Sequence, residues 1–307
     1  MTTHEQVTDV LHYTAFSSHP DGGNPAGVVL DASGLDDAAM LAIAARLGYS
    51  ESAFLTGTPE GPGGEPAGLT GQPGGLAGTP GRAFTVRYFS PLAEVPFCGH
   101  ATVAAAVALA ERIGPGDLVF ATRAGTVPVT VTADADGTLR ATLTSVEPRI
   151  EEIAPEELAE ALAALDWPSA DLDPLLPPRI AFAGARHLVL GAGSRERLAD
   201  LSYDFERLAA LMRKLDLTTV QLVWRAADTV FHVRDPFPIG GVVEDPATGA
   251  AAAAFGAYAR ELALVPPESV LTLHQGEDMG RPGVLTVTLH ADDPKVRVSG
   301  AGTRMSR

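Results

Sequence analysis

Two side chains able to do chemistry stand just before a predicted helix. The segment EVPFCGHATVAAAVALAER, residues 94–112, carries Cys98 and His100 ahead of a run of alanine and valine. The unpaired backbone N–H groups at the amino end of a helix favour negative charge, so this position suits a carboxylate ligand or a reactive thiolate. Taken singly, His100 is more often a hydrogen-bonded structural histidine and Cys98 a small buried apolar residue.

A second alanine-rich segment begins in a similar way. Residues 244–252 read EDPATGAAA, and Asp245 could cap the helix that follows, with Pro246 at its first position. The sequences VRYFSP and VRDPFP precede the two segments, which indicates an internal duplication. Two such helix ends facing each other would form a binding site for a carboxylate, with His100 and Asp245 at duplicated positions.

Glu51 is the third candidate for chemistry. It lies in GYSESAFL, residues 48–55, where a predicted helix gives way to an apolar strand. A carboxylate that enters an apolar environment can exchange protons near neutral pH, and so can act as a general base or acid. By position alone, a solvated loop glutamate is the simpler interpretation.

The elements that must position these residues alternate between strands and helices, which indicates an α/β fold. A helix with alanine and glycine on every face is suited to burial, because small side chains let strands approach closely. We therefore expect two similar α/β halves, each folded around an alanine-rich helix. The expected helices are 36–47, 101–112, 155–165, 205–215 and 247–262, and the expected strands are 9–16, 28–31, 53–56, 83–89, 126–133, 139–143, 220–224, 229–234, 271–274, 284–290 and 296–298.

Composition argues against several classes of protein. The 307 residues carry a formal net charge of -16, which repels phosphate backbones and anionic lipid, so we expect no nucleic-acid or membrane partner. No apolar run reaches the ~20 residues that cross a bilayer, and MTTHEQVTDV has no signal-peptide features. A single cysteine fits a reducing cytoplasm, where we expect the protein to act.

Signatures of cofactors and metals are weak. LVLGAGSRER has Gly-x-Gly after a strand but no third glycine, so a dinucleotide site is not expected. The histidines include no pair at metal-binding spacing on one helix and Cys98 has no second cysteine, which argues against zinc. Glycine and proline make up more than half of residues 57–82, which we interpret as a flexible surface insertion.

Five motifs occur in a characteristic order: GNPAGVVL, YSESAFL, RYFSPLAEVPFCGHATVAAA, GVVEDPATGAA and HQGEDMGRP. Together they resemble the phenazine-biosynthesis PhzF-like isomerase family, relatives of diaminopimelate epimerase, over nearly the whole chain. The resemblance implies an α/β fold of two pseudo-symmetric halves, each a curved, mostly antiparallel β-sheet or barrel around a buried alanine-rich central helix. The active site would lie between the halves, with no metal and no cofactor. The first half would hold residues 1–127 and a C-terminal strand at 294–307, with the insertion at 57–82, and the second half residues 128–293. Members are commonly homodimers, so we expect a homodimer.

The resemblance also implies roles for particular residues. The family's catalytic glutamate falls on Glu51, its Gly-His pair on Gly99 and His100, and its aspartate before proline on Asp245. In members of known activity the glutamate takes a proton from one carbon and a proton is returned at another, which shifts a double bond. The histidine and aspartate position polar groups of the substrate or relay protons. The residues expected to bind substrate are Asn24, Gly99, Ala101, Thr102, Thr248, Gly249 and Ala250.

The chain departs from the family pattern at several positions. Ala250 replaces the usual serine, which removes one side-chain donor, and Pro236 stands where an aromatic residue is common. The epimerase relatives use two cysteines, one at each central helix. Cys98 falls where the first would be, but Pro246 and Ala247 occupy the region of the second, so a two-thiol racemisation lacks its partner.

We therefore expect a cofactor-independent isomerase that acts on a small carboxylate, with Glu51 as the acid–base group and His100 and Asp245 orienting the substrate. Two alternatives stay open. One is an epimerase or racemase that uses Cys98 with Glu51, and the other is a non-catalytic protein that binds a small acid. A purely structural protein is a third and weaker possibility.

Overall fold

The computed structural model describes residues 9–57 and 82–306, so most of the expected insertion lies outside the described residues. The chain forms two compact units. Of the described residues, the first holds 9–20, 25–57, 82–143 and 301–306, and the second holds 21–24 and 144–300. Residue 127 lies inside a strand that pairs with both of its neighbours, and the division between the two units follows Leu143.

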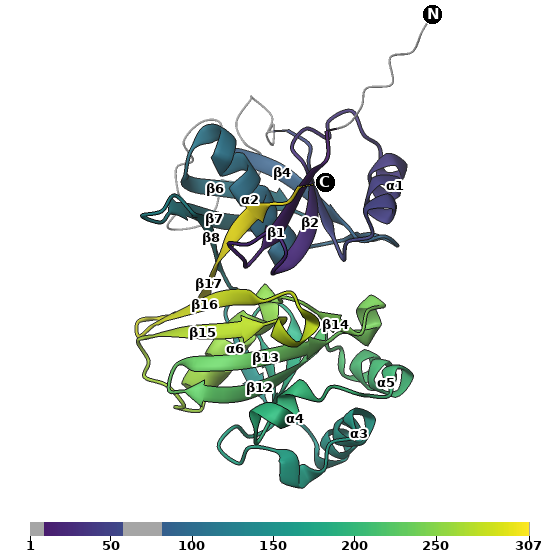
Figure 1. Ribbon diagram of the computed structural model, residues 1–307, viewed down its shortest axis with the longest axis vertical. Helices are drawn as coiled ribbons and strands as arrows, with labels where there is room; N and C mark the ends of the chain where they lie inside the picture. Colours follow the sequence, from purple (N-terminus) through teal and green to yellow (C-terminus); the bar gives the residue numbers. More distant parts are fainter. Residues whose placement is uncertain (1–8, 58–81, 307) are drawn as a thin grey trace, which may run out of the picture. The chain divides into compact units, whose positions relative to one another are not determined.

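The first unit is a mixed sheet with two helices. Strand pairs β2–β3 and β4–β6 are parallel, whereas β3–β4, β4–β5, β6–β7 and β7–β8 are antiparallel, and β1 pairs with the C-terminal end of β17. Its elements are β1 (Leu11–Ala15), β2 (Asn24–Val29), α1 (Asp37–Leu47), β3 (Ser52–Leu55), β4 (Ala83–Phe89), β5 (Glu94–Val95), α2 (Gly99–Ile113), β6 (Gly116–Thr122), β7 (Gly125–Ala133) and β8 (Leu139–Thr144) (Figure 1).

The second unit has the same alternation of strand directions. Pairs β11–β12 and β13–β15 are parallel, and the pairs β9–β10, β10–β11, β12–β13, β13–β14, β15–β16 and β16–β17 are antiparallel. Its elements are β9 (Arg149–Glu151), α3 (Pro155–Leu165), η1 (Ser169–Asp171), β10 (Arg179–Phe182), β11 (Arg186–Gly191), α4 (Arg195–Ala199), α5 (Phe205–Leu215), β12 (Thr219–Ala227), β13 (Val230–Pro236), η2 (Pro238–Gly240), β14 (Glu244–Asp245), α6 (Gly249–Glu261), β15 (Ser269–Gln275), η3 (Glu277–Met279), β16 (Gly283–His290) and β17 (Asp293–Arg304).

Helices α2 and α6 are the buried helices of the two units. In α2 every residue from His100 to Ala110 is buried, and in α6 every residue from Ala251 to Ala259 is buried. Small residues allow this packing. A Cβ added to Gly256 would lie 2.6 Å from Val287 of β16, closer than atoms can pack, so α6 approaches this strand at a glycine. The expectation of burial for both alanine-rich helices is confirmed.

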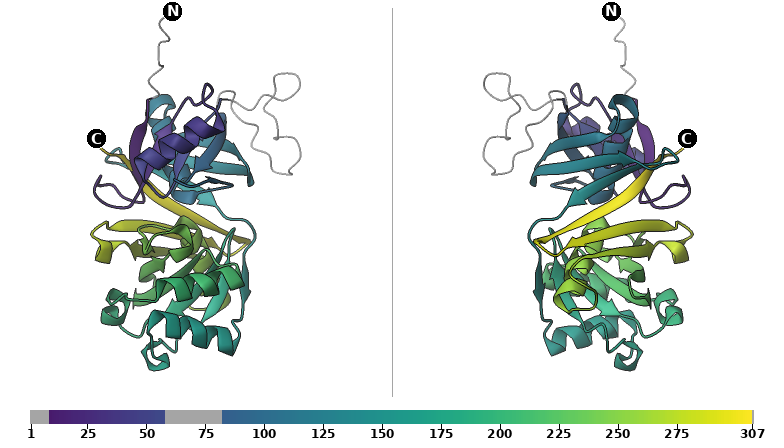
Figure 2. Two further views of the ribbon diagram at one scale, coloured as in Figure 1. Left: turned by 90° about the vertical axis from the view of Figure 1, so that its right-hand side faces the viewer. Right: turned by 90° about the vertical axis from the view of Figure 1, so that its left-hand side faces the viewer.

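The remaining long helices lie on the outside of the sheets. Helix α1 is capped by Asp36, whose carboxylate accepts from the Ala39 N–H at 2.8 Å, and it ends at Gly48 with φ 69°. Helices α3 and α5 lie side by side on the second unit, and together with β11 and β12 they enclose an apolar core (Figures 1 and 2). The described part of the chain contains no helix of the length and hydropathy that a membrane span needs.

Candidate active site

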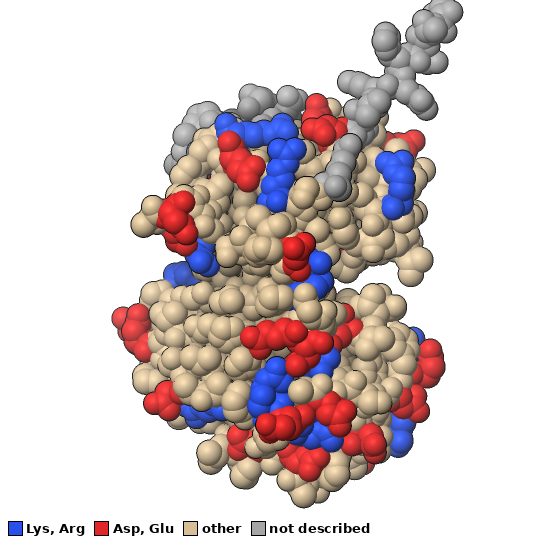
Figure 3. Space-filling view, in the orientation of Figure 1, with Lys and Arg blue, Asp and Glu red and all other residues tan. Residues whose placement is uncertain are grey.

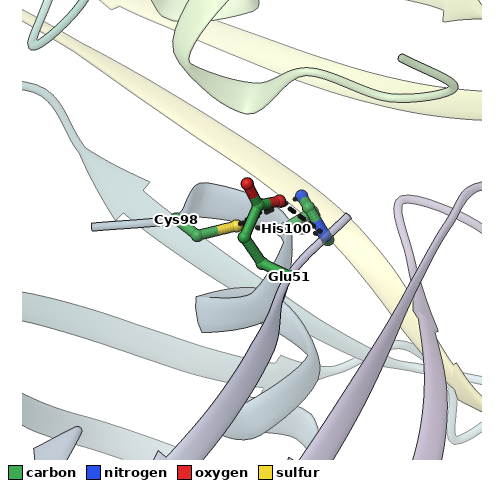
Figure 4. A group of neighbouring side chains, drawn as sticks. All are labelled: Glu51, Cys98 and His100. Atoms are coloured by element: carbon green, nitrogen blue, oxygen red, sulfur yellow. Dashed lines mark hydrogen bonds and ion pairs between the residues drawn. The ribbon is translucent and has the colours of Figure 1, made fainter. Parts of the chain in front are cut away.

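Glu51, Cys98 and His100 lie together in the first unit (Figure 4). The Cys98 thiol donates to Glu51 Oε2 at 3.5 Å, and Cys98 Sγ lies 3.3 Å from His100 Nδ1. His100 Nε2 is 3.7 Å from the same Glu51 oxygen. Cys98 and His100 are buried, while the Glu51 side chain keeps 17% of its surface exposed, so the carboxylate is the member of the group that solvent or a ligand can reach.

Strand register explains why residues so far apart in sequence meet. Glu51 immediately precedes β3, and the first residue of β3, Ser52, pairs with Phe89 at the end of β4. Phe89 in turn pairs with Glu94 of β5. Strand β5 ends at Val95, and α2 begins four residues later, at Gly99. The carboxylate is therefore placed beside the amino end of α2, where backbone N–H groups favour negative charge.

Buried hydrogen bonds hold this end of α2 in place. Thr102 donates its hydroxyl to the Cys98 carbonyl at 2.6 Å, so the Tyr88 hydroxyl, 2.6 Å away, must donate to Thr102. Burial raises the pKa of Tyr88. On the other side, the Ser50 hydroxyl lies 3.3 Å from His100 Nε2 and fixes the ring from the segment that carries Glu51.

The expected substrate-binding residues of α2 differ in what they present. Gly99 is half-buried, and the space around its Cα is open. Ala101 is fully buried, so only its backbone could serve a ligand. The hydroxyl and N–H of Thr102 both bond to Cys98 O, so Thr102 stabilises the first helical turn rather than presenting a donor.

A second polar cluster surrounds the start of α6 in the second unit. Asp245 accepts from the Asn24 amide at 2.8 Å through Oδ1 and from the Thr248 hydroxyl at 2.5 Å through Oδ2. The Gln275 amide donates to the Asp245 carbonyl and to Thr248 Oγ1, and its oxygen accepts from the Thr248 N–H. Asn24 also donates to the Ala247 carbonyl at 3.0 Å. Asn24, Asp245 and Gln275 are all buried.

Asp245 does not cap α6, contrary to the simpler interpretation of its position. The helix begins at Gly249, with Thr248 in the capping position, so Pro246 is not its first residue. The carboxylate instead bonds two side chains from different segments. Gly249 and Ala250, both expected to bind substrate, are half-buried at the first turn.

Each buried helix is preceded by the same ion pair. Arg87 of β4 makes two hydrogen bonds of 2.8 Å to Glu94 of β5. Arg234 of β13 makes the corresponding bonds, 2.9 and 2.5 Å, to Glu244 of β14. In both cases the helix starts five residues after the glutamate. Cys98 immediately precedes α2 and Thr248 immediately precedes α6, so these two residues correspond. The family's motif pattern had instead placed Pro246 and Ala247 in the region that corresponds to Cys98.

A buried polar chain lies behind Asp245 on the neighbouring strands. His187 Nδ1 is 2.8 Å from the Thr219 hydroxyl, which donates to Asp235 Oδ1 at 2.7 Å. Within the described residues, Asp235 Oδ2, His187 Nε2 and the amide of Gln221 make no hydrogen bond. Burial raises the pKa of Asp235 well above its usual range, and the nearby Asp245 adds to the effect. Burial also lowers the pKa of His187 to about 3.

Sequence reasoning missed several of these residues. Gln275 belongs to the motif HQGEDMGRP, so the motif was the available signal, although no residue of it was selected. Ser50 and Tyr88 gave no signal of their own, because a hydroxyl beside a candidate residue is common.

Comparisons with known proteins agree with the motifs. The family model described as phenazine biosynthesis-like protein, PhzC-PhzF, matches residues 13–307. An uncharacterized isomerase, YddE, of Escherichia coli O157:H7 is 33% identical over 302 residues, covering 95% of this chain and 94% of the relative. A trans-2,3-dihydro-3-hydroxyanthranilate isomerase of Pseudomonas aeruginosa is 28% identical, covering 95% and 91%.

Solved structures give the same fold. The crystal structure of a PhzF-family phenazine biosynthesis protein of Bacillus anthracis matches with a TM-score of 0.79 and 25% identity, covering 97% of this chain and 96% of that one. A probable proline racemase of Agrobacterium radiobacter matches at 13% identity with a TM-score of 0.60, covering 97% and 91%, which shows an epimerase-type α/β fold. Given the family match over residues 13–307 and isomerase relatives over almost its whole length, the chain belongs to the phenazine biosynthesis-like PhzC-PhzF family and is an isomerase.

Proposed function

We propose that this isomerase moves a carbon-bound proton, and with it a double bond, in a small carboxylate substrate, and that Glu51 is the acid–base group. The observation that carries the proposal is the contact of a partly exposed Glu51 carboxylate with His100 and Cys98 at the amino end of α2. Glu51 would take a proton from one carbon and return it at another, so no electrons are gained or lost. The buried His100 ring, 3.7 Å from the carboxylate, would orient it.

The group around Asp245 would bind polar atoms of the substrate. The support for this role is the set of hydrogen bonds around the Asp245 side chain. Asn24, Thr248 and Gln275 hold the Asp245 side chain and the loop before α6 in one arrangement, so the first turn of that helix is fixed before a ligand arrives. Backbone N–H groups at Gly249 and Ala250 could bind an anion even though Ala250 lacks the family's hydroxyl. Asp245→Asn should therefore lower turnover, and retained full turnover would contradict this role.

The two units are further proposed to be duplicated halves. Parallel and antiparallel strand pairs follow one another in the same order in both units, which supports this proposal. The Arg–Glu pair found before each buried helix supports it too. That the protein is a homodimer in the cytoplasm stays a prediction, and the mass measured by light scattering after gel filtration tests the dimer.

Epimerisation is the second candidate, because the Cys98 thiol contacts the Glu51 carboxylate. Thr248 stands at the position that corresponds to Cys98, so the second thiol of a two-cysteine reaction would be replaced by a hydroxyl that does not form an anion near neutral pH. The variants Cys98→Ser and Glu51→Gln separate the candidates. Isomerisation predicts a large loss only in Glu51→Gln, whereas epimerisation predicts comparable losses in both.

The first substrate to test is trans-2,3-dihydro-3-hydroxyanthranilate, the compound in the name of the Pseudomonas aeruginosa relative. Other small unsaturated carboxylates follow, chosen by a thermal-shift screen. Removing a general acid–base group typically costs ~10²- to 10⁴-fold in rate, so Glu51→Gln should lose activity on that scale. Glu156→Gln, on the exposed first turn of α3, is the control for loss of one carboxylate. Full activity in Glu51→Gln would refute the assignment.

A further inference from the structure

The cluster formed by Glu51, Cys98 and His100 has a composition that general acid–base catalysis does not need. It brings together a thiol, an imidazole and a carboxylate, with one ligand atom from each lying within 4.8 Å of the others. These are the three side-chain types that bind zinc in proteins. Three protein ligands with a fourth position left open is the usual arrangement of an accessible zinc site.

The distances also fit a tetrahedral ion. With Zn–S near 2.3 Å and Zn–N and Zn–O near 2.0–2.1 Å, tetrahedral angles place the ligand atoms roughly 3.4–3.6 Å apart. In the cluster, Sγ lies 3.5 Å from Glu51 Oε2, and Nε2 of His100 lies 3.7 Å from Oε2 and 3.8 Å from Sγ. Shifts of a few tenths of an ångström would therefore complete three sides of a coordination tetrahedron.

We propose that this cluster binds a thiophilic divalent cation such as Zn²⁺, and that the bound cation inhibits the enzyme. The inhibitory half rests on the proposed role of Glu51. Coordination would occupy the Glu51 oxygen that faces the thiol and imidazole, so the carboxylate could no longer take a proton from carbon. The Cys98 thiol would bind as thiolate and release its proton to solvent.

Local structure favours one ion at this place. Cys98 and His100 are held by the first turn of α2, where the Thr102 hydroxyl fixes the Cys98 carbonyl, and a metal at His100 Nε2 would take the place of the Ser50 contact with that nitrogen. The exposed fraction of Glu51 gives a cation an entry path and a place for a water as fourth ligand. Spacing within one helix could not reveal this site, because the carboxylate comes from the loop before β3.

A direct binding measurement tests the site. We would titrate the metal-free protein with Co²⁺, following the thiolate-to-cobalt absorption band, and with Zn²⁺ by calorimetry. One ion per chain is expected, with the charge-transfer band that marks a sulfur ligand. Loss of a hydrogen-bond partner behind a metal ligand costs about 10- to 100-fold in affinity, so loss of a ligand itself should cost at least about 100-fold. Cys98→Ser, His100→Gln and Glu51→Gln should each show this loss, with thermal unfolding confirming that they fold.

The matched control lies in the second unit. His232 and His274 stack with ring centroids 4.9 Å apart, and His232 bonds Glu277 at 2.6 Å, so this half-buried pair is the alternative place for a metal. The double variant His232→Gln/His274→Gln should keep the cobalt band and the Zn²⁺ affinity. If the control loses binding while Cys98→Ser keeps it, the inference is overturned.

Inhibition is measured separately from binding. Zn²⁺ added at one equivalent should abolish turnover of an identified substrate, and a chelator should restore it. If Zn²⁺ binds through the three residues but turnover continues, the inhibitory half is refuted. If the protein binds Zn²⁺ in this way but no acid is ever turned over, the proposed function fails while the metal site stands.

Discussion

The buried carboxylate of Asp235 should make the stability of the protein depend on pH. Its side chain has no exposed surface, its Oδ2 has no hydrogen-bond partner among the described residues, and Asp245 and Glu244 are nearby negative charges. Thr219 supplies one compensating hydrogen bond. The raised pKa means that the folded protein keeps the proton at pH values where the unfolded chain, with a pKa of about 3.9, has lost it.

The magnitude follows from proton linkage. Between the unfolded and folded pKa values, unfolding releases one proton, so the free energy of unfolding falls by about 1.4 kcal/mol for each pH unit. His187 acts in the opposite direction. Its folded pKa is about 3 against about 6.5 unfolded, so unfolding takes up a proton between these values and stability rises with pH there. The two effects oppose each other above about pH 4, where the titration ranges of the two groups overlap.

Comparison of the wild type with Asp235→Asn isolates the carboxylate, because His187 is present in both proteins. The amide keeps the shape and can still accept from Thr219. We expect the wild type to lose stability relative to Asp235→Asn as the pH rises above about 4, with a slope approaching about 1.4 kcal/mol per pH unit until the folded pKa is passed. Urea denaturation at half-unit pH steps measures this difference. A difference that does not change from pH 4 to pH 8 would show that Asp235 is ionised in the folded protein and would refute the reasoning.

Two further predictions concern the loop before α6. Glu244→Gln leaves Arg234 buried with its charge uncompensated, so it should cost about 3–5 kcal/mol in urea denaturation, and a cost below 1 kcal/mol would contradict the buried ion pair. Gly276 has φ 80°, and a Cβ there would lie 2.3 Å from the Arg281 carbonyl oxygen and 2.7 Å from that of Pro246. Gly276→Ala should therefore lower the free energy of unfolding by more than about 1 kcal/mol. An unchanged denaturation midpoint would contradict this geometry.

Much of the fold could be predicted because local signals were strong. Helices 155–165 and 205–215 have the expected bounds, since Pro155 at the first helical position and the Asp204 cap mark their starts. Strand 83–89 also has its expected bounds. The helix expected at 101–112 begins two residues earlier, at Gly99, and the one expected at 247–262 begins two residues later, at Gly249.

Other elements carried no local signal. Strands β5 and β14 have two residues each and exist because β4 and β13 offer them a partner. Strand β6 was not expected, and β17 is far longer than 296–298, the range that local composition indicated, because it pairs with β16 at one end and with β1 at the other. Only the family resemblance indicated a strand over 294–307. Long-range pairing decides such strands, and a single sequence does not display it.

The candidate site was predictable as a set of residues but not as a geometry. Glu51 and His100 were selected separately, and only the register between β3 and β4 explains their contact. For Asp245, position in the sequence suggested a helix cap, which the structure does not show. Its real partners are Thr248, three residues away, and Asn24, 221 residues away in sequence.

Surface charges of opposite sign lie next to one another in the second unit, which the net charge alone did not reveal. Acidic and basic side chains are interleaved on the face of the second unit shown in Figure 3. In the same unit, Arg195 pairs with Asp278 at 3.0 Å. Arg197 pairs with Asp171 and Asp200 in the same unit. Pairs of this kind are worth little individually and weaken with salt, so they contribute little to stability.

The central claim is that Glu51 moves a proton between carbons of a bound acid. The most direct test is incubation of the enzyme with its substrate in deuterium oxide, with NMR detection of deuterium at carbon. The account predicts label at the carbon that receives the proton with wild-type enzyme and with Cys98→Ser, and no label above background with Glu51→Gln. Carbon labelling at the wild-type rate in Glu51→Gln would contradict it.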